Sequence, residues 1–195
     1  PMYGERAFYL GYWHSVSAFC NAGFDLFGNY DSLTKFVGDG VVNFCVMSLI
    51  TLGGLGFIVM DDVLSKRKFK SLTVHSKVVI LASAGLVIAG TVVFRLIELN
   101  NPDTLANLSY ADQWLASMFQ AVTPRTAGFN TLPLEKVEDS SLFLMVILMI
   151  IGASPASTGG GIKTTTLAVI LMSAWAVLRG RNDIVIFERR ISKKA

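Results

Sequence analysis

Charged residues are scarce in this 195-residue chain: 16% are Asp, Glu, Lys or Arg, whereas about a quarter is usual in soluble domains. The apolar share is 52%, with long apolar runs at residues 41–60, 78–96 and 142–178. A soluble core helix needs only one apolar stripe, whereas about 20 consecutive apolar residues match the hydrocarbon core of a bilayer. The scarcity of charge therefore argues against a soluble domain and predicts three membrane spans.

Cysteine and histidine are also rare. Cys20 and Cys45 give neither a disulfide framework nor the spacing of a metal site. His14 and His75 do not complete a metal cluster with them, and the sequence shows no pairing of a nucleophile with a base. These absences predict that the chain is not an enzyme and carries no covalently bound cofactor.

The basic residues are unevenly distributed. Eleven of the 17 fall in residues 61–77 and 179–195, whereas the loops between the spans are acidic. Short loops rich in Lys and Arg stay on the cytoplasmic side, and a three-span topology puts both basic stretches on one side. We therefore predict a multi-pass plasma-membrane protein with both stretches in the cytoplasm. The basic stretches are interpreted as topology signals, not as nucleic-acid binding sites.

An internal repeat organises the chain. The sequence Asn21-Ala22-Gly23-Phe24-Asp25 recurs as Thr126-Ala127-Gly128-Phe129-Asn130, and each copy follows a short amphipathic segment, at residues 11–19 and 112–123. The segment 105–130 has to begin and end on the outer side, because the next span leads to the basic tail. Such a re-entrant loop is tolerated only where it is covered by protein or lines water. The predicted order is therefore pore loop, span, span, pore loop, span.

Each copy of the repeat has the properties of a cation filter. Such a filter replaces water with backbone carbonyl oxygens, and glycine permits the unusual dihedral angles that this requires. The preceding short helices would aim their negative C-terminal ends at the site. One Ala-Gly-Phe is typical of a turn, but two equivalent copies favour a filter. The predicted filter segments are Cys20, Asn21, Ala22 and Gly23, and Arg125, Thr126, Ala127 and Gly128.

The third apolar run, residues 142–178, is longer than one crossing needs, since its 37 residues would form a helix of roughly 55 Å. Proline and three consecutive glycines lie in its middle, and both residue types disfavour helix. We predict a broken helix with an irregular loop over residues 152–162 that sits in the pore. The predicted gating loop comprises Gly152, Ala153, Ser154, Pro155, Ala156, Ser157, Thr158, Gly159, Gly160, Gly161 and Lys163.

Two charged residues near these segments need interpretation. Lys163 is either a functional intramembrane charge or a side chain that reaches the cytoplasmic interface, and the sequence leaves both open. Arg125 would repel cations if it faced the pore. We expect it to point behind the filter and to pair with an acid or with carbonyls.

Other interpretations of the glycine-rich segments were weighed. A phosphate-binding loop is rejected because Ile162 separates Gly161 from Lys163 and no strand precedes the loop. An anion held at the start of the second half-helix stays open, which would make the chain a secondary transporter with broken helices. A non-conducting membrane scaffold is the third alternative. The cluster at residues 53–56 is assigned to helix packing.

At residues 17–24, 120–130 and 152–165 the chain resembles the Trk/Ktr/HKT superfamily of cation transporters, specifically the Ktr membrane subunit. The resemblance implies four helix–pore-loop–helix repeats around one pore, with Gly23 in the second repeat and Gly128 in the third. It implies passive K⁺ translocation, with K⁺ held by backbone carbonyls near Asn21, Ala22 and Gly23 and near Thr126, Ala127 and Gly128. Na⁺ is a second candidate ion.

The resemblance also implies partners. The loop at residues 152–162 would gate the pore under a cytosolic nucleotide-binding ring, and the subunit would form a homodimer in contact with membrane lipid. Because two filter segments do not close a four-sided pore, the rest of the same subunit or further chains are needed.

The predicted fold is thus an all-α integral membrane protein. Residues 1–60 would end one repeat, 61–77 form a cytoplasmic loop, 78–178 form the next repeat, and 179–195 form a cytoplasmic tail.

Overall fold

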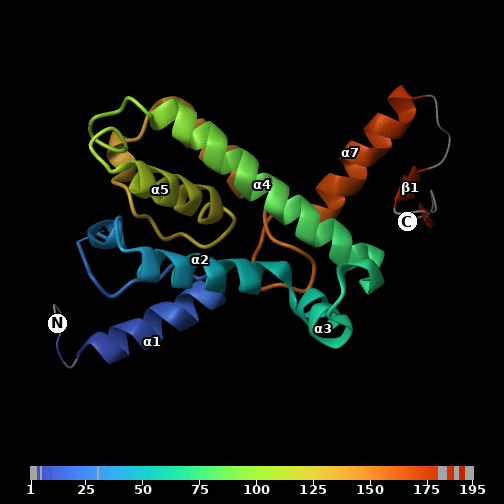
Figure 1. The fold of residues 1–195 in the computed structure, drawn as a ribbon, viewed down its shortest axis with the longest axis horizontal. Helices are drawn as coiled ribbons and strands as arrows, with labels where there is room; N and C mark the ends of the chain where they lie inside the picture. The colour runs from blue at the N-terminus through green and yellow to red at the C-terminus, as the bar shows by residue number, and fades with distance from the viewer. Residues whose placement is uncertain (1–3, 5, 30, 180–183, 187–188, 192–195) are drawn as a thin grey trace.

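Helices make up most of the structure, a computed structural model that describes residues 4, 6–29, 31–179, 184–186 and 189–191. They are α1 (Arg6–Phe19), α2 (Gly40–Leu55), α3 (Phe57–Lys66), α4 (Val74–Glu98), α5 (Tyr110–Val122), α6 (Asp139–Ile150) and α7 (Thr164–Leu178) (Figure 1). Single 3-10 turns lie at Thr34–Phe36, Phe69–Ser71 and Leu134–Lys136.

One short hairpin departs from the predicted all-α class. Strands β1 (Ile184–Ile186) and β2 (Arg189–Ile191) pair antiparallel within the predicted basic tail. β-Branched residues such as Ile184 and Val185 favour strands. The prediction of a tail rested on the basic charge of this stretch alone. The rest of that predicted tail after Arg179 lies outside the described residues.

Polar side chains fix where three of the helices begin. Asp39 accepts hydrogen bonds from the N–H groups of Val41 and Val42 at the start of α2. Thr73 and Ser109 accept from the third residue of α4 and of α5 in the same way. Such caps satisfy N–H groups that have no partner inside the helix. They therefore set the starts of α4 and α5 within a few residues of the predicted positions.

The predicted spans differ in how closely the helices match them. Helix α4 is the one described helix that is long and apolar enough to cross a membrane by itself. The run at residues 41–60 is not one straight span, because α2 and α3 meet at Gly56 with a bend of 98°. Gly56 has φ +90°, a left-handed conformation that ends the helix. The run predicted as one span is therefore made of two helices, and the predicted boundary at residue 60 falls inside α3.

The predicted break in the last span is confirmed. Helix α6 ends at Ile150, α7 begins at Thr164, and no helix or strand is assigned to the residues between them. The irregular segment, residues 151–163, exceeds the predicted one by a residue at each end. Residues 151–163 are called the loop segment below.

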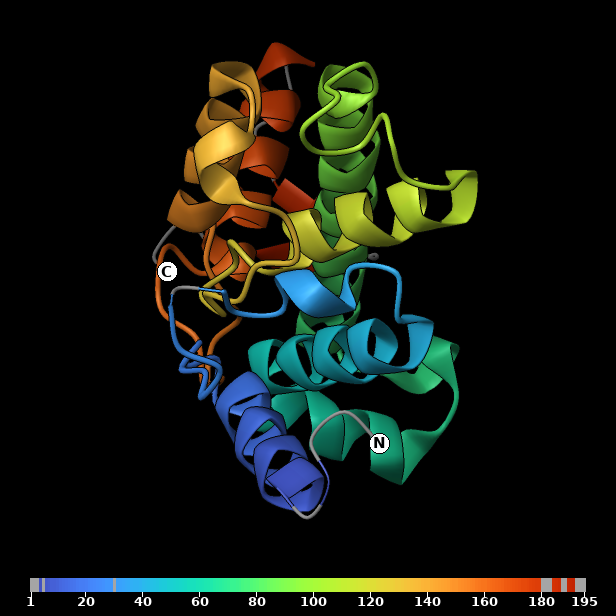
Figure 2. The same cartoon turned by 90° about the vertical axis from the view of Figure 1, so that its left-hand side faces the viewer.

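The filter segments lie where α1, α2 and α5 pack together. In both views α5 lies between α4 and α2, and α1 packs on α2 (Figures 1 and 2). Buried apolar side chains from the three helices and from the second copy of the repeat form one cluster, including Ala18, Met47, Phe119, Ala127 and Phe129. A second cluster joins α4, α5 and α6. The two copies of the repeat are thereby held against a common core.

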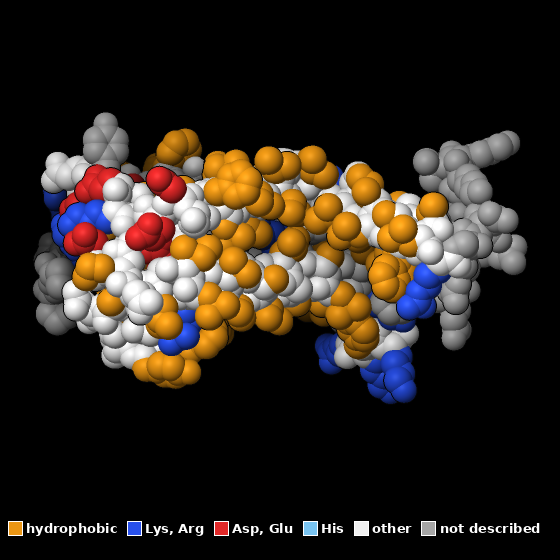
Figure 3. Space-filling view, turned by 90° about the horizontal axis from the view of Figure 1, so that it is seen from above, with side chains coloured by type: hydrophobic (Ala, Val, Ile, Leu, Met, Phe, Trp, Pro, Cys, Tyr) orange, Lys and Arg blue, Asp and Glu red, His pale blue; other side chains and the backbone are white. Residues whose placement is uncertain are grey.

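The surface separates apolar from charged groups. Hydrophobic side chains cover the middle of the face in Figure 3, and the acidic side chains visible there gather at one end. Many large apolar side chains are exposed on the helices, for example Phe44, Ile88, Phe143 and Leu171. An apolar surface of this extent is unusual for a soluble monomer and marks a surface that another apolar phase covers.

Candidate functional site

The two predicted filter segments share one backbone conformation. In the first, Asn21 has φ +51° and Gly23 has φ +70°; in the second, Thr126 has φ +78° and Gly128 has φ +88°. Left-handed conformations at the second and fourth positions of each segment therefore recur 105 residues apart. A residue with a side chain adopts this conformation at a cost and seldom without a structural reason. The repeat seen in the sequence is thus also a repeat of backbone geometry.

The two filter segments touch at their glycines. A Cβ atom added to Gly23 would overlap the carbonyl oxygen of Ala127 and lie 3.0 Å from Cα of Gly128. A Cβ atom added to Gly128 would lie 3.4 Å from Cα of Gly23. Glycine is therefore required at position 23 for close approach as well as for its dihedral angle. The fold brings together the residues that the sequence predicts to act together.

The N–H groups of both filter segments point back to the helix before them. Ala22 N donates to Ser17 O at 2.9 Å, and Ala127 N donates to Thr123 O at 3.0 Å. The hydroxyl groups of Ser17 and Thr123 then donate to the carbonyl oxygens of Phe24 and Phe129. The C-terminal ends of α1 and α5, where helix dipoles are negative, consequently lie at the filter segments. This arrangement favours a cation over an anion.

The loop segment packs against the break between α2 and α3. Ser154 N donates to Gly54 O at 3.0 Å, Thr158 N donates to Gly53 O at 3.2 Å, and Phe57 N donates to Ala156 O at 3.0 Å. The ends of a helix leave backbone groups without partners. The loop segment supplies these partners, which explains how the chain can break between α2 and α3.

The glycine cluster at residues 53–56 packs closely against neighbouring backbone, at the end of α1 and at the loop segment. A Cβ atom at Gly53 would overlap the carbonyl oxygen of Phe19, at the end of α1. A Cβ atom at Gly56 would lie 2.6 Å from the carbonyl oxygen of Pro155. Small residues let the backbones approach. The cluster therefore joins α2 to the end of α1 and to the loop segment.

The loop segment also contacts both filter segments. Asn21 Nδ2 donates to Thr158 Oγ1 at 2.7 Å, and Thr158 Oγ1 donates to Phe19 O at 3.0 Å. A Cβ atom at Gly159 would overlap the hydroxyl group of Thr126. Lys163 Nζ donates to Gly159 O at 3.0 Å, so this lysine folds back onto the loop segment.

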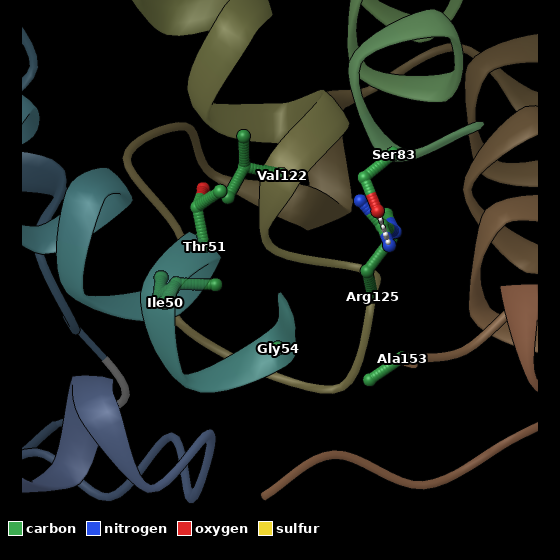
Figure 4. Close-up of a pocket in the computed structure, with 7 residues that line it drawn as sticks. All are labelled: Ile50, Thr51, Gly54, Ser83, Val122, Arg125 and Ala153. Atoms are coloured by element: carbon green, nitrogen blue, oxygen red, sulfur yellow. Dashed lines mark hydrogen bonds between the residues drawn. The ribbon is translucent and has the colours of Figure 1, made fainter. Parts of the chain in front are cut away.

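Arg125 lies away from the contact between the two filter glycines. Its side chain is 9% exposed and points toward α4, where Nη2 donates to Ser83 Oγ at 3.2 Å (Figure 4). The prediction of an acid or carbonyl partner is wrong for the described residues, because the recorded acceptor is a hydroxyl group. The apolar run at residues 78–96 contains no acidic residue that could take this place.

Two buried oxygen atoms at the filter segments have no hydrogen-bond donor among the described residues. They are Asn21 Oδ1 and Thr126 Oγ1, at equivalent positions of the two copies. A buried acceptor without a donor is costly unless something else satisfies it. A passing cation or its water would do so, and these oxygen atoms therefore fit the predicted chemistry.

Several residues of this site were not predicted. The hydroxyl groups of Ser17 and Thr123 bind the carbonyl group of the residue that follows each filter segment, and that of Ser83 binds Arg125; none of these roles was predicted from the sequence. Ser17 and Thr123 could have been suggested by their place in the last turn of each short helix. Ser83 offered no such signal, because it lies in an apolar run far from the repeat.

Comparisons with known proteins give the family. The model of the family described as "TrkH: Cation transport protein" matches residues 2–195. The chain is 42% identical over 190 residues to Ktr system potassium uptake protein B of Vibrio alginolyticus, covering 96% of this chain and 41% of that protein. It is 38% identical over 196 residues to the potassium/sodium uptake protein NtpJ of Enterococcus hirae, covering 100% of this chain and 43% of that protein. The chain thus spans about two fifths of the length of these relatives.

A solved structure has the same fold. The crystal structure of the potassium transporter TrkH from Vibrio parahaemolyticus matches with a TM-score of 0.72 and 18% identity, over 91% of this chain and 38% of that one. The family matches the resemblance inferred from the sequence, and a cation transport family agrees with the prediction that the chain is not an enzyme. By the match of nearly its whole length, this chain belongs to the TrkH family of cation transport proteins.

Proposed function

We propose that this chain is part of the pore-forming membrane subunit of a potassium uptake system. The observation that carries the proposal is the contact of two equivalent filter segments at Gly23 and Gly128, each behind the C-terminal end of a short helix. The names of the relatives, potassium uptake and potassium/sodium uptake proteins, support K⁺ as the ion and keep Na⁺ as a second candidate.

Translocation is proposed to be passive. K⁺ enters from the outside, loses water to carbonyl oxygens near Asn21–Gly23 and Thr126–Gly128, and moves down its electrochemical gradient. The unpaired oxygen atoms of Asn21 and Thr126 belong to these same two segments. Arg125 supports the second filter segment from behind, where its charge does not face the ion.

The loop segment is the proposed gate. It contacts both filter segments through Thr158 and Gly159, so it blocks the path below them until it moves. A cytosolic nucleotide-binding ring is the proposed regulator, in contact with the basic residues at 61–77 and 179–195. The proposed assembly is a homodimer in a lipid bilayer, with both basic stretches in the cytoplasm.

The remaining pore walls come from outside this chain. Two filter segments form part of a four-sided filter, and the chain spans 41% of the first relative. We propose that residues 1–60 and 78–178 are the second and third of four repeats. The other two repeats belong to the rest of the same subunit.

The alternative of an anion transporter is less well supported. An anion at the start of α7 would need free N–H groups and a free lysine. Thr164 N instead donates to Ala153 O, and Lys163 Nζ donates to Gly159 O. The geometry therefore favours a cation pathway, and the non-conducting scaffold does not explain the paired left-handed filter segments.

The experiment measures K⁺ uptake by the full-length protein that contains this chain, in cells without their own K⁺ uptake. We expect wild type to restore growth at low K⁺ and Gly128→Ser to lose preference for K⁺ over Na⁺. Deletion of residues 157–161 should leave the flux open without the cytosolic partner. If wild type moves no monovalent cation, or if Gly128→Ser changes nothing, the assignment of the filter is wrong.

A further inference from the structure

Among the described residues, Thr158 carries the one hydroxyl group of the loop segment that forms a hydrogen bond directly with a filter residue. Its oxygen accepts from Asn21 Nδ2 at 2.7 Å, and the two residues are 137 positions apart in the sequence. The same oxygen donates to Phe19 O at 3.0 Å. A single hydroxyl group thus joins the loop segment, the filter segment and the end of α1.

The directions of these bonds are fixed by chemistry. A threonine hydroxyl has one hydrogen, and Phe19 O is a pure acceptor, so the hydroxyl hydrogen goes to Phe19. The bond to Asn21 must then be donated by the Asn21 amide. A second acceptor, Ile50 O, lies 3.5 Å from the same Nδ2 atom. Only one orientation of the Asn21 amide is compatible with both acceptors.

This bond reaches a filter residue whose backbone is left-handed. Asn21 has φ +51°, and its side chain is 8% exposed. A left-handed conformation of a residue with a side chain has to be maintained by the surrounding structure. The Asn21 side chain donates its recorded hydrogen bonds to Thr158 Oγ1 and Ile50 O. The shorter of these two hydrogen bonds, at 2.7 Å, joins Asn21 to Thr158 of the loop segment.

We propose that Thr158 is a positioning residue of the filter, so that the gate sets ion selectivity as well as flux. The proposal rests on the function proposed above and adds to it a direct link between gate and filter. When the loop segment leaves, Asn21 loses its shorter bond and the carbonyl groups of the first filter segment become less well ordered. Opening the gate without a replacement for this bond would therefore weaken discrimination between K⁺ and Na⁺.

The loop segment contains a matched control. Ser157 Oγ donates to Ser154 O at 2.6 Å, a bond that stays within the loop segment. Loss of the Ser157 hydroxyl changes the loop segment itself but not the bond to the filter. Thr158→Ser keeps the hydroxyl group and removes only a methyl group, so it should preserve selectivity.

The experiment compares Thr158→Ala, Asn21→Ala, the double variant, Ser157→Ala and Thr158→Ser in the full-length protein. Competition between K⁺ and Na⁺ for uptake is measured at matched amounts of protein in the membrane. One hydrogen bond is worth about 1 kcal/mol, so we expect about a fivefold loss of K⁺ over Na⁺ preference for Thr158→Ala. Asn21→Ala should lose about as much, and the double variant no more than either single variant. Ser157→Ala and Thr158→Ser should keep the wild-type preference.

The outcomes separate this proposal from the function on which it rests. If wild type takes up K⁺ and Asn21→Ala loses preference while Thr158→Ala keeps it, the link is wrong and the filter remains. An additive double variant, or an equal loss for Ser157→Ala, would also overturn the link. Absence of K⁺ uptake by wild type would overturn the proposed function itself.

Discussion

The two copies of the repeat have the same left-handed backbone positions but differ in the contacts that surround these positions. In the first, the left-handed Asn21 is bonded by its side chain to Thr158 of the loop segment. In the second, the left-handed Thr126 packs its hydroxyl against Gly159, and none of the described residues donates to that hydroxyl. The comparison teaches that the repeat reproduces local geometry, whereas the surroundings of each copy are individual.

The second helix of each repeat shows the same contrast. Gly56 and Gly161, which are 105 positions apart like the filter glycines, have φ of +90° and +76°. In the first repeat the break is this single residue, and α3 follows at once. In the second repeat the break is the whole loop segment. The longer break supplies a segment that can reach both filters.

The largest effect on K⁺ uptake is expected from replacing one of the two filter glycines, and the two replacements should differ. Gly23→Ala places a Cβ atom against the carbonyl oxygen of Ala127, whereas Gly128→Ala meets only Cα of Gly23 at 3.4 Å. Both variants carry a left-handed strain of roughly 1–2 kcal/mol, and Gly23→Ala adds overpacking of roughly 1–3 kcal/mol. We expect K⁺ uptake to fall about fivefold or more further for Gly23→Ala than for Gly128→Ala. Equal uptake of the two variants would contradict the recorded contact.

Adjacent glycines of α2 give the next prediction. A Cβ atom at Gly53 would overlap Phe19 O and lie 2.9 Å from Thr158 Oγ1, whereas at Gly54 the nearest atom is Ala153 Cβ at 3.9 Å. Gly53→Ala should therefore lower the thermal stability of the purified protein, with a cost of about 1–3 kcal/mol. Gly54→Ala is the matched control and should unfold like wild type. A greater loss for Gly54→Ala would show that the loop segment packs differently.

Arg125 and Cys20 occupy equivalent positions in the two copies of the repeat but have different surroundings. Arg125 is buried and bonded to Ser83, whereas Cys20, 105 positions earlier, is exposed and has no disulfide. A hydrogen bond to a charged group is worth about 1.5–3 kcal/mol. Arg125→Ala should lower thermal stability and reduce uptake several-fold, while Cys20→Ala should leave thermal stability near wild type. The thermal stability of Ser83→Ala, which keeps the charge of Arg125 but removes its hydrogen-bond acceptor, should lie between those of the two other variants. If Arg125→Ala behaved like wild type, the proposed support of the second filter segment by Arg125 would be wrong.

The smallest effect is expected at Lys163. Its ammonium group donates to Gly159 O, a carbonyl group of the loop segment, and the residue 105 positions earlier is the apolar Ile58. Lys163→Met loses one partly exposed bond of about 1 kcal/mol and should raise basal K⁺ flux by no more than about fivefold. Flux measured without the cytosolic partner tests this. A complete loss of uptake would favour a direct role of the charge in translocation.

Much of the architecture followed from local properties of the sequence. The scarcity of charge and the apolar runs indicated membrane helices, and Pro155 with the glycines at 159–161 indicated the break before α7. The repeated Ala-Gly-Phe located the filter segments, because a left-handed φ is a preference of the residue itself. These features depend on residues close together in the chain, so a single sequence was enough to find them.

Other features depended on packing between distant segments. The bend at Gly56 required the loop segment to supply partners for the broken ends of α2 and α3. Ser83 became the partner of Arg125 only because α4 lies behind the second filter segment.

The sequence by itself determined the family, the repeat with its left-handed glycines and the break in the last apolar run, since hydropathy and backbone preference are local. Only the tertiary structure decided that the filter segments touch at Gly23 and Gly128 and that Thr158 bonds to Asn21. The physical reason is that a hydrogen bond needs two atoms within about 3.5 Å. For residues 137 positions apart, that distance is set by how the intervening helices pack.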